Sequence, residues 1–282
     1  MKKEGVGVSL VAYKISTNYL EKLSDSLDLC DLAYRVVVDN SPTTKSKKLF
    51  EKRNWTYIHK PENIGFGAAH NLVYNLHSNK SKYHLVINPD VYFHKNILLD
   101  LIEFMDFNKN AGAVSPAIYY PDGSFQRLQK LLPSPYGWLM RRFMKNSKSL
   151  KKYNYNFELR MSKEEAIFKY PYMSGCFMLL RNSIIDKIKL FDENIFMYGE
   201  DTDLSRKLWI NGTPPYYYGK VKAFHVFGKG SHNSLKLLMI AIKSTIYYFN
   251  KWGWIDSQRR KINRECLKQF KKNSQTNNNN YI

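Results

Sequence analysis

Hydrophobic and polar positions in the first hundred residues form short apolar runs separated by amphipathic stretches. Apolar or β-branched runs, typical of buried strands, occupy residues 6–13, 34–38, 55–59 and 83–87. The segments between and after them, 19–29, 44–52, 68–76 and 96–107, are predicted to be helices. Strands that alternate with helices indicate the α/β class, with a mostly parallel central sheet flanked by helices.

The pattern changes in the middle of the chain. Residues 125–157 contain no acid, whereas Lys and Arg accumulate there. Pro133, Pro135 and Gly137 interrupt this stretch, so it is predicted to be an irregular, mobile basic insertion spanning about 125–170.

Regular patterns return after the insertion. They predict a strand at 173–180, a helix capped by Ser183, a helix at 201–211 closed by Gly212, and strands at 216–218 and 221–226. Residues 234–252 are amphipathic, 259–272 are basic, and 277–280 are a run of Asn.

These patterns predict three regions. A catalytic domain is expected at 1–232, a helical amphipathic and basic C-terminal appendage at 233–273, and a disordered tail at 274–282. With 282 residues, of which 44% are hydrophobic and 15% aromatic, the chain can bury a sizeable core. Global disorder is therefore excluded.

The chain is strongly basic, with 44 Lys plus Arg against 24 Asp plus Glu. A solvated surface, an anionic membrane or nucleic acid could each account for this charge, but no nucleic-acid-binding motif accompanies it. Cys30, Cys176 and Cys266 fit neither a disulfide framework nor a zinc module, which favours a reducing cytoplasm. No signal peptide is recognised before the first strand, and no apolar stretch reaches the ~18 residues of a spanning helix.

Because acids are scarce, their positions are informative. Asp90 ends the sequence Asn88-Pro89-Asp90, directly after an apolar run. A carboxylate just past a buried strand can hold Mg²⁺ or Mn²⁺, which prefer oxygen ligands and bridge phosphates. The alternative is an Asp in a turn or capping the helix that starts near Lys95.

A second acidic group, Glu200 and Asp201, lies at the predicted start of a helix. The helix dipole stabilises negative charge there, so Asp201 could stay ionised and accept a proton. Both could equally be ordinary first-turn acids. Asp203 is predicted to be structural, because Lys207 follows four residues later and can pair with it.

Two further segments could contact an anionic ligand. Asn63 to Asn71 is a Gly-rich loop, with Gly65 and Gly67, that runs into a helix. Such a loop can approach a phosphate, or its glycines can serve turn geometry alone. His225 ends the last strand and precedes Lys229 and Ser231; it could reach a metal or a pyrophosphate, or be structural.

Taken together and in order, these segments resemble the family-2 inverting glycosyltransferases, particularly bacterial rhamnosyltransferases of O-antigen and surface-polysaccharide assembly. The resemblance runs from Val8 to about Trp252. It rests on six segments: Val38-Asp39-Asn40, 63–71, 88–90, Ser174-Gly175-Cys176-Phe177-Met178, 191–203 and 225–231.

The resemblance implies a GT-A fold, a nucleoside-diphosphate sugar donor and inversion at the anomeric carbon. It implies that Asp201 is the general base, with Glu200 beside it, and that Asp90 and His225 hold Mg²⁺ or Mn²⁺ at the diphosphate. The implied donor contacts are Asp39 (at the base), Asn40, Asn63, Gly65, Gly67, Asn71, Asn88, Lys229 and Ser231. Asn88 replaces the first Asp of the family's Asp-Xaa-Asp, so metal affinity is expected to be modest.

The expected reaction is transfer of a sugar, best matched by L-rhamnose from dTDP-rhamnose, to a glycan acceptor on a polyprenyl diphosphate. The basic and amphipathic segments 127–152, 234–252 and 259–272 are expected to bind the anionic inner face of the cell membrane peripherally. Alternatively, 234–252 packs on the sheet or forms a homodimer interface. Other functions that remain open are transfer from a UDP-sugar, a nucleotidyltransferase, and a basic binding protein without catalysis.

Overall fold

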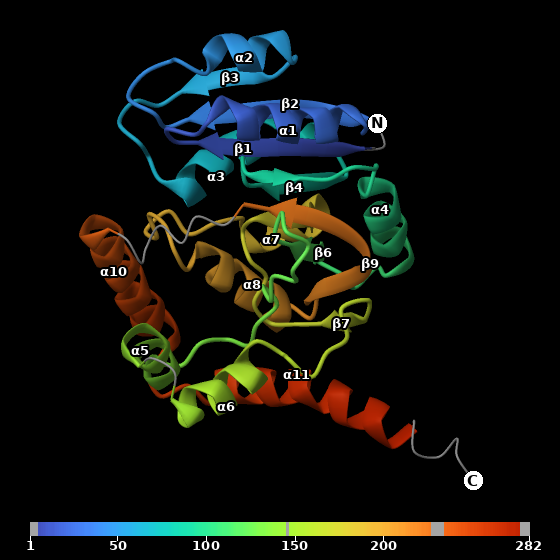
Figure 1. Cartoon of the computed structure of the whole chain (residues 1–282), viewed down its shortest axis with the longest axis vertical. Coiled ribbons are helices and arrows are strands. Elements are labelled where there is room, and N and C mark those ends of the chain that lie inside the picture. Colours follow the sequence, from blue (N-terminus) through green and yellow to red (C-terminus); the bar gives the residue numbers. More distant parts are fainter. Residues whose placement is uncertain (1–4, 145–146, 227–233, 277–282) are drawn as a thin grey trace.

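A computed structural model describes residues 5–144, 147–226 and 234–276, with side chains described as far as Lys271. Its centre is a 9-stranded sheet in the order β3-β2-β1-β4-β8-β6-β9-β5, with β7 added on β9 (Figure 1). The strands are β1 (Val6–Ala12), β2 (Leu32–Asp39), β3 (Thr56–His59), β4 (Tyr83–Ile87), β5 (Val91–Tyr92), β6 (Ala113–Tyr119), β7 (Ile167–Lys169), β8 (Phe177–Arg181) and β9 (Pro215–His225).

Helices cover both faces of this sheet and extend beyond it at the C-terminal end (Figure 1). They are α1 (Thr17–Asp28), α2 (Lys47–Lys52), α3 (Phe66–His77), α4 (Leu98–Phe107), α5 (Pro135–Phe143), α6 (Lys148–Phe157), α7 (Asn182–Ile188), α8 (Glu200–Ile210), α10 (Leu235–Trp252) and α11 (Ser257–Thr276), with a short 3-10 turn η1 (Ser78–Lys80). The predicted α/β class with helices flanking the sheet is confirmed.

The N-terminal half of the sheet is parallel because each strand returns through a helix. β1 pairs in parallel with β2 and β4, and β2 pairs in parallel with β3. β8 then enters antiparallel between β4 and β6, and β9 resumes the parallel direction beside β6. The carboxyl ends of β1, β2, β4 and β6 therefore share one edge with the amino end of β8.

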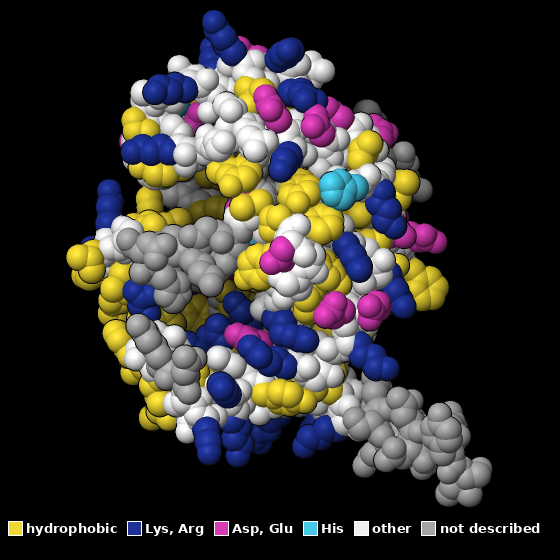
Figure 2. Space-filling view, viewed as in Figure 1, with side chains coloured by type: hydrophobic (Ala, Val, Ile, Leu, Met, Phe, Trp, Pro, Cys, Tyr) yellow, Lys and Arg dark blue, Asp and Glu magenta, His cyan; other side chains and the backbone are white. Residues whose placement is uncertain are grey.

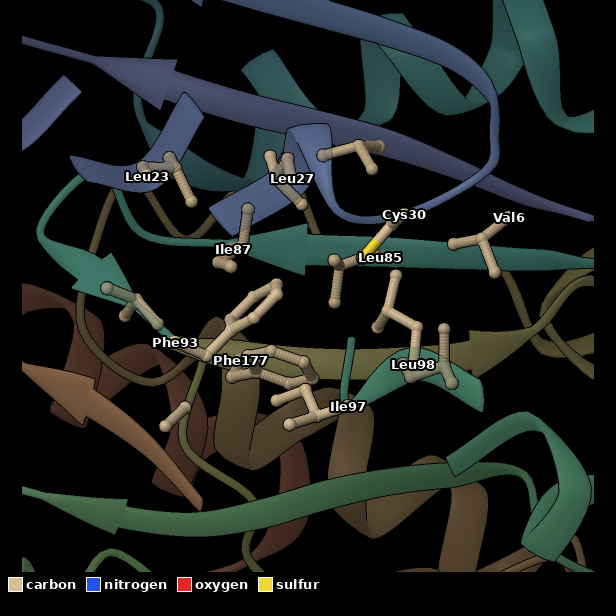
Figure 3. Packing of buried hydrophobic residues seen from close by; sticks show 14 of the residues in the cluster. Val6, Leu23, Leu27, Cys30, Leu85, Ile87, Phe93, Ile97, Leu98 and Phe177 are labelled. Carbon is tan, nitrogen blue, oxygen red and sulfur yellow. The ribbon is translucent and has the colours of Figure 1, made fainter. Parts of the chain in front are cut away.

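Two apolar layers hold the helices to the sheet. On one face Leu23 and Leu27 of α1 pack in a cluster with Ile87 and Phe177 from the sheet (Figure 3). A second cluster joins β6, β8, α8 and the insertion, and reaches Cys266 of α11, and a smaller third cluster joins β2 to α3. The side-chain spacing in α1 brings its apolar stripe onto the sheet, as helical periodicity requires.

The insertion is more ordered than its sequence predicted, which corrects the expectation of an irregular segment. It contains α5, α6 and β7. Ser134 caps α5 by accepting a hydrogen bond from the Gly137 amide at 3.0 Å, and Pro135 occupies the first turn, where no amide partner is needed. Gly137 lies so close to the Tyr153 ring that a side chain would collide with it. Of the residues that suggested a break, Pro135 thus begins a helix and Gly137 makes room for a packing contact.

Other element boundaries also differ. β6 was not predicted; Pro116 interrupts its apolar run, and the register with β9 shifts just after this proline. The two strands expected at 216–218 and 221–226 form one strand, β9. The strand expected at 173–180 begins at Phe177, and α7 begins at Asn182 without a Ser183 cap.

The C-terminal helix α11 and the residues just before it pack on the insertion and on α8. Asn263 of α11 donates to and accepts from the backbone of Leu132, at 3.0 and 2.9 Å. Arg206 of α8, 1% exposed, forms an ion pair with Asp256 at 2.5 Å, just before α11. α11 continues to Thr276, three residues into the predicted disordered tail, and 277–282 lie outside the described residues. Within the described segments, every helix is too short or too polar to cross a bilayer.

A buried polar network ties β1, β2, β4 and α3 together. The Ser9 hydroxyl lies 2.6 Å from His70 Nδ1 and 2.7 Å from His84 Nε2, and the Tyr34 hydroxyl lies 2.9 Å from His84 Nδ1. Burial lowers the pKa of both imidazoles, that of His84 to about 3. Both histidines are therefore neutral in the folded protein at neutral pH.

This network predicts that acid destabilises the fold. Below pH 6.5 the unfolded chain binds protons at His70 and His84, whereas the folded chain does not. Their stabilising contribution is therefore complete above about pH 6.5 and declines as pH falls toward 3. Urea unfolding should show a loss of about 1 to 2 kcal/mol per histidine between pH 7 and 5.

The matched variants are His84→Gln, which should flatten this pH dependence, and His94→Gln on the surface, which should leave it unchanged. An unaltered slope in His84→Gln would contradict the assignment.

Candidate active site

The backbone just before β8 brings the two predicted carboxylate groups together. β8 starts at the edge where β4 ends, so residues 174–176 lie beside Asn88. The Asn88 amide donates to the Cys176 carbonyl at 2.9 Å, and the Gly175 amide donates to Asp201 Oδ2 at 3.1 Å. Asp201 and the loop that carries Asp90 therefore flank the same three residues.

Asp90 and His225 meet at the end of β9. β5 follows Asp90 and pairs antiparallel with the last residues of β9, and the Val226 amide donates to the Asp90 carbonyl at 3.0 Å. This pairing leaves Asp90 Oδ1 at 3.4 Å from His225 Nε2. Asp90 and His225, which are 135 positions apart in the sequence, thus place an oxygen and a nitrogen atom next to each other.

This pair fits a divalent cation. Two ligands each about 2.1 Å from one metal lie about 3.0 to 3.4 Å apart at ordinary coordination angles. Among the described residues, no cluster of three or more His, Cys, Asp or Glu could hold a metal. Asp90 and His225 would thus supply two ligands, and the coordination of a cation such as Mg²⁺ is typically completed by substrate phosphates and water.

The start of α8 carries Glu200 and Asp201 beyond a strained turn, with Tyr198 at φ 72° and Gly199 at φ 121°. Burial, and then the neighbouring Asp201 charge, raise the pKa of Glu200 to about 8. Burial also raises the pKa of Asp201, but the backbone amides of Gly175 and Thr202 donate to its carboxylate. Two adjacent buried carboxylates resist a double charge, so burial beside Asp201 favours the protonated form of Glu200, while the two amide hydrogen bonds favour the charged form of Asp201.

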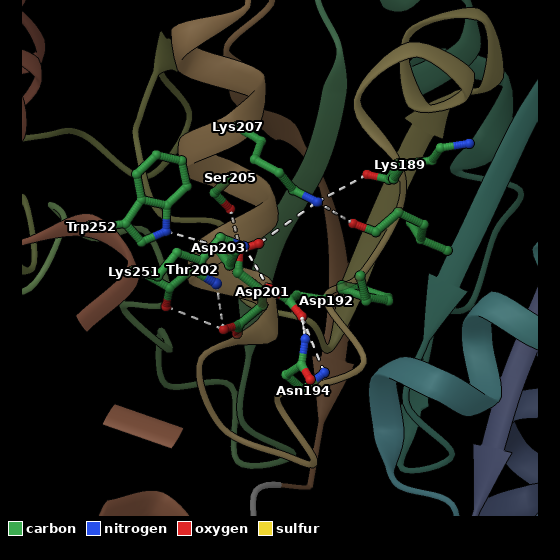
Figure 4. Close-up of polar contacts among 12 residues, drawn as sticks. Lys189, Asp192, Asn194, Asp201, Thr202, Asp203, Ser205, Lys207, Lys251 and Trp252 are labelled. Carbon is green, nitrogen blue, oxygen red and sulfur yellow. Dashed lines mark hydrogen bonds and ion pairs between the residues drawn. The ribbon is translucent and has the colours of Figure 1, made fainter. Parts of the chain in front are cut away.

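Asp192 and Asp203, on either side of Glu200 and Asp201, form contacts that hold the start of α8 in place (Figure 4). Asp203 is buried; it accepts from Trp252 Nε1 at 2.8 Å and forms ion pairs with Lys251 at 2.8 Å and Lys207 at 3.7 Å. The predicted structural pairing of Asp203 with Lys207 is confirmed. Lys251 also binds Asp192 at 2.6 Å, and although burial raises the pKa of Asp192, this hydrogen bond and that of Asn194 bring it to about 2.

A cavity of about 390 Å³ opens at Glu200 and Asp201. The insertion forms one wall and α10 another, and the lining combines cationic, aromatic and aliphatic side chains. Its members include Lys130, Trp138, Arg141, Arg142, Phe157, Tyr172, Leu238, Ala241, Thr245 and Tyr248. Burial and the nearby Arg141 charge lower the pKa of Lys130.

Apart from residues 198–202, no motif in the sequence indicated the residues that line this cavity. Lys130 belongs to the basic insertion, Tyr172 follows it, and α10 comes after the last strand. The only available signal was the concentration of Lys and Arg in 125–157, which indicated an anionic ligand but no geometry.

The predicted donor residues at the ends of β2 and β4 lie at the expected edge. Asp39 is buried and accepts from the Ser41 amide at 2.9 Å and the Tyr57 hydroxyl at 2.7 Å. Asn40 donates to the Gly65 carbonyl at 3.2 Å, while its own side-chain oxygen has no partner among the described residues. Asn88 is half-buried beside Asp90.

The Gly-rich loop packs against the acidic segment. A side chain on Gly65, at φ 92°, would lie 2.6 Å from the Phe196 carbonyl, and one on Gly67 would lie 3.0 Å from Phe191. Asn63 accepts from the Gly65 amide at 3.2 Å. The contacts therefore assign the two glycines to close packing, and their donor contacts stay a prediction.

Asn71 links α3 to the loop before α8. Its side chain donates to the Phe191 carbonyl and to Glu193, each at 2.9 Å, and accepts from the Phe191 amide at 3.0 Å. These bonds use both hydrogens and the oxygen of the side-chain amide, so Asn71 holds α3 against the loop before α8. Lys229 and Ser231 lie outside the described residues.

Fold and carboxylate geometry together define a glycosyltransferase of the GT-A class. The chain belongs to glycosyl transferase family 2, whose model matches residues 20–189. It is 25% identical over 244 residues to the rhamnosyltransferase WbbL of Escherichia coli K12, covering 82% of this chain and 88% of that protein. Family membership favours the transferase over the nucleotidyltransferase and the binding protein.

Solved structures share the fold at low identity. The mannosyltransferase PcManGT from Pyrobaculum calidifontis, in complex with GDP-Man and Mn²⁺, aligns over 89% of this chain with a TM-score of 0.60 and 16% identity. GalNAc-T7 with UDP, GalNAc and Mn²⁺ aligns over 80% with a TM-score of 0.59 and 14% identity. The chain spans 64% and 44% of the length of these two proteins.

Lys251 is expected to stabilise the segment that carries the candidate base. Replacing Lys251 with Met removes two ion pairs and leaves the buried Asp203 with fewer partners, so the free energy of unfolding should fall by about 2 kcal/mol. Lys243→Met, on the exposed side of the same helix, should change it by less than about 0.5 kcal/mol. Urea unfolding of both variants measures the difference, and equal effects would contradict this role.

Proposed function

We propose that this protein is an inverting glycosyltransferase that moves a sugar from a nucleoside-diphosphate donor to an acceptor hydroxyl bound in the cavity at Asp201. The observation that carries the proposal is the position of Asp201. Its carboxylate accepts hydrogen bonds from two backbone amides and lines a cavity large enough for a sugar ring.

The chemistry is a single displacement. Asp201 accepts the proton of the acceptor hydroxyl while that oxygen attacks the anomeric carbon. The bond between the anomeric carbon and the diphosphate oxygen breaks, and the nucleoside diphosphate leaves with the electron pair. Attack from the face opposite the leaving group inverts the anomeric configuration. Glu200, protonated at neutral pH, contributes a neutral carboxyl to the wall of the cavity.

Asp90 and His225 are proposed to hold Mg²⁺ or Mn²⁺ at the donor diphosphate. When bound, the cation would neutralise charge that develops on the leaving group. The donor complexes of PcManGT and GalNAc-T7 contain Mn²⁺, which supports this role by analogy. Asp39, Asn40, Asn63, Gly65, Gly67, Asn71, Asn88, Lys229 and Ser231 remain the proposed surroundings of the nucleotide.

The proposed donor is dTDP-rhamnose. Similarity to WbbL over most of both chains supports a rhamnosyl donor, and a UDP-sugar is the alternative. The proposed acceptor is a glycan on a polyprenyl diphosphate. Lys130 and Arg142 line the cavity together with Leu238 and Ala241, a combination of positive charge and apolar surface that suits an anionic lipid-linked sugar.

The acceptor proposal requires that the protein reach a membrane surface. Exposed large hydrophobic residues concentrate on α5, on α10 and in the turn after it: Tyr136, Leu139, Phe143, Leu235, Met239, Ile246, Trp254 and Ile255. Hydrophobic side chains follow the edge where α10 lies, and Lys and Arg gather below it, near α6 and α11 (Figure 2). Amphipathic surfaces with adjoining basic residues bind anionic lipid.

Some residues expected from the sequence to face a membrane are instead buried or paired within the protein. Trp252 turns inward to Asp203 and stacks over Arg206, so only Trp254 of the two tryptophans is exposed. Arg141 pairs with Glu158, and Arg259 is buried. The lipid-facing charges are therefore assigned to the exposed α11 residues Arg260, Lys261, Arg264 and Lys268.

The base assignment predicts that Asp201→Asn lowers the rate of sugar transfer by about 10²- to 10⁴-fold, because the amide cannot take the proton. Donor affinity should stay near wild type, since Asp201 faces the acceptor cavity. Transfer is measured by release of nucleoside diphosphate from dTDP-rhamnose and, separately, from UDP-sugars in the presence of acceptor. Retained turnover in Asp201→Asn would move the assignment to Glu200, for which Glu200→Gln is the companion variant.

The membrane assignment predicts salt-sensitive flotation with anionic vesicles and none with neutral ones. Changing Arg260, Lys261, Arg264 and Lys268 to Gln should weaken binding by about 10²- to 10³-fold, at about 1 kcal/mol for each charge. The matched control removes four lysines at the opposite end of the molecule, Lys45, Lys47, Lys48 and Lys52 (Figure 1). Equal weakening in both variants would indicate nonspecific charge attraction, and no binding at low salt would end the membrane assignment.

A further inference from the structure

Gln126 is a buried side chain bonded to His225 through two separate contacts. It is 2% exposed and follows β6, and its backbone amide is anchored on the Ile118 carbonyl at 2.9 Å. Its side-chain Nε2 donates to the His225 carbonyl at 2.6 Å, and its Oε1 lies 3.1 Å from His225 Nδ1. It belongs to the basic insertion, where no motif drew attention to it.

These two contacts fix the protonation of the imidazole. A carbonyl oxygen only accepts hydrogen bonds, so the Gln126 atom that faces the His225 carbonyl must be the NH₂ group. The other end of the same amide is then Oε1, which also only accepts. The hydrogen between Oε1 and His225 Nδ1 therefore resides on Nδ1.

A neutral imidazole protonated on Nδ1 carries a lone pair on Nε2. That atom lies 3.4 Å from Asp90 Oδ1, which is also an electron-pair donor. Two such atoms repel unless a proton or a cation lies between them. The tautomer selected by Gln126 is thus the one in which His225 can serve as a metal ligand alongside Asp90.

We propose that Gln126 is a positioning residue that holds His225 in the Nδ1-protonated tautomer and so presents Nε2 to a divalent cation shared with Asp90. The inference rests on the metal role proposed above and deepens it. Partners that orient a metal-binding histidine through its second nitrogen typically change metal affinity by about 10- to 100-fold.

The tautomer can be measured without any metal or substrate. Two-bond ¹⁵N–¹H correlation spectra of the ¹⁵N-histidine-labelled protein distinguish Nδ1–H from Nε2–H, and the His225→Asn spectrum identifies the His225 signals. The wild type is expected to show Nδ1–H at a pH where the ring is neutral. An Nε2–H pattern there would overturn the proposal.

The effect on the metal is tested with Gln126→Met, which keeps length and packing but removes both hydrogen bonds. Mn²⁺ affinity in the presence of dTDP, followed by the electron paramagnetic resonance signal of free Mn²⁺, should fall by about 10- to 100-fold. Gln129→Met is the matched control. Gln129 is equally buried, and its side-chain Nε2 has no hydrogen-bond partner within the described part of the chain, so its replacement should leave Mn²⁺ affinity unchanged.

Asp90→Ala separates this inference from the metal role on which it rests. Loss of Mn²⁺ affinity in Asp90→Ala together with unchanged affinity in Gln126→Met would overturn the role of Gln126 alone. Unchanged affinity in Asp90→Ala would overturn the metal site itself. Sugar transfer is measured in a separate assay. A failure of the proposed glycosyl transfer can therefore be distinguished from a failure of the metal site or of the role of Gln126.

Discussion

The antiparallel entry of β8 between β4 and β6 is the constraint from which the site follows. A parallel strand in that position would begin at the opposite edge of the sheet. Because β8 runs the other way, residues 174–176 lie at the edge where β4 ends, with Asn88 bonded to one side of them and Asp201 to the other. One reversed strand thus joins a loop from the first hundred residues to a helix a hundred residues later.

Electrostatics then decides which carboxylate can act. Asp192 and Asp203 are both neutralised by Lys251, and Asp203 also accepts from Trp252. Glu200 and Asp201 form no ion pair within the described residues, and their proximity and burial oppose a second charge. The surrounding ion pairs hold the start of α8 in position, so Glu200 and Asp201 are desolvated on a fixed support.

Sequence periodicity predicted the β1–β4 half of the fold well, because each strand and helix there is stabilised mainly by its own apolar face. It failed where tertiary contacts overrule local signals. Gly137 suggested a break in regular structure, but it lies within α5, where its missing side chain leaves room for the Tyr153 ring. Pro116 interrupts the apolar run of β6, and the register with β9 shifts just after it. The positions of Asp90, Asp201 and His225 at element ends were predicted from the sequence, and their chemical roles stay predictions. The contact of Gln126 with His225 could not be predicted, because it depends on a hydrogen bond across 99 residues.

The family model covers only part of the candidate site. Its match ends at residue 189, before Asp201, His225 and α10. Up to that point the chain supplies the sheet edge and, apart from Lys229 and Ser231, the residues proposed to surround the nucleotide. The walls of the cavity come from the insertion and from α10, which also carry the exposed hydrophobic residues. The proposed acceptor cavity and the proposed membrane surface therefore share one helix: Leu238 and Ala241 of α10 line the cavity, whereas Leu235 and Met239 of the same helix are exposed.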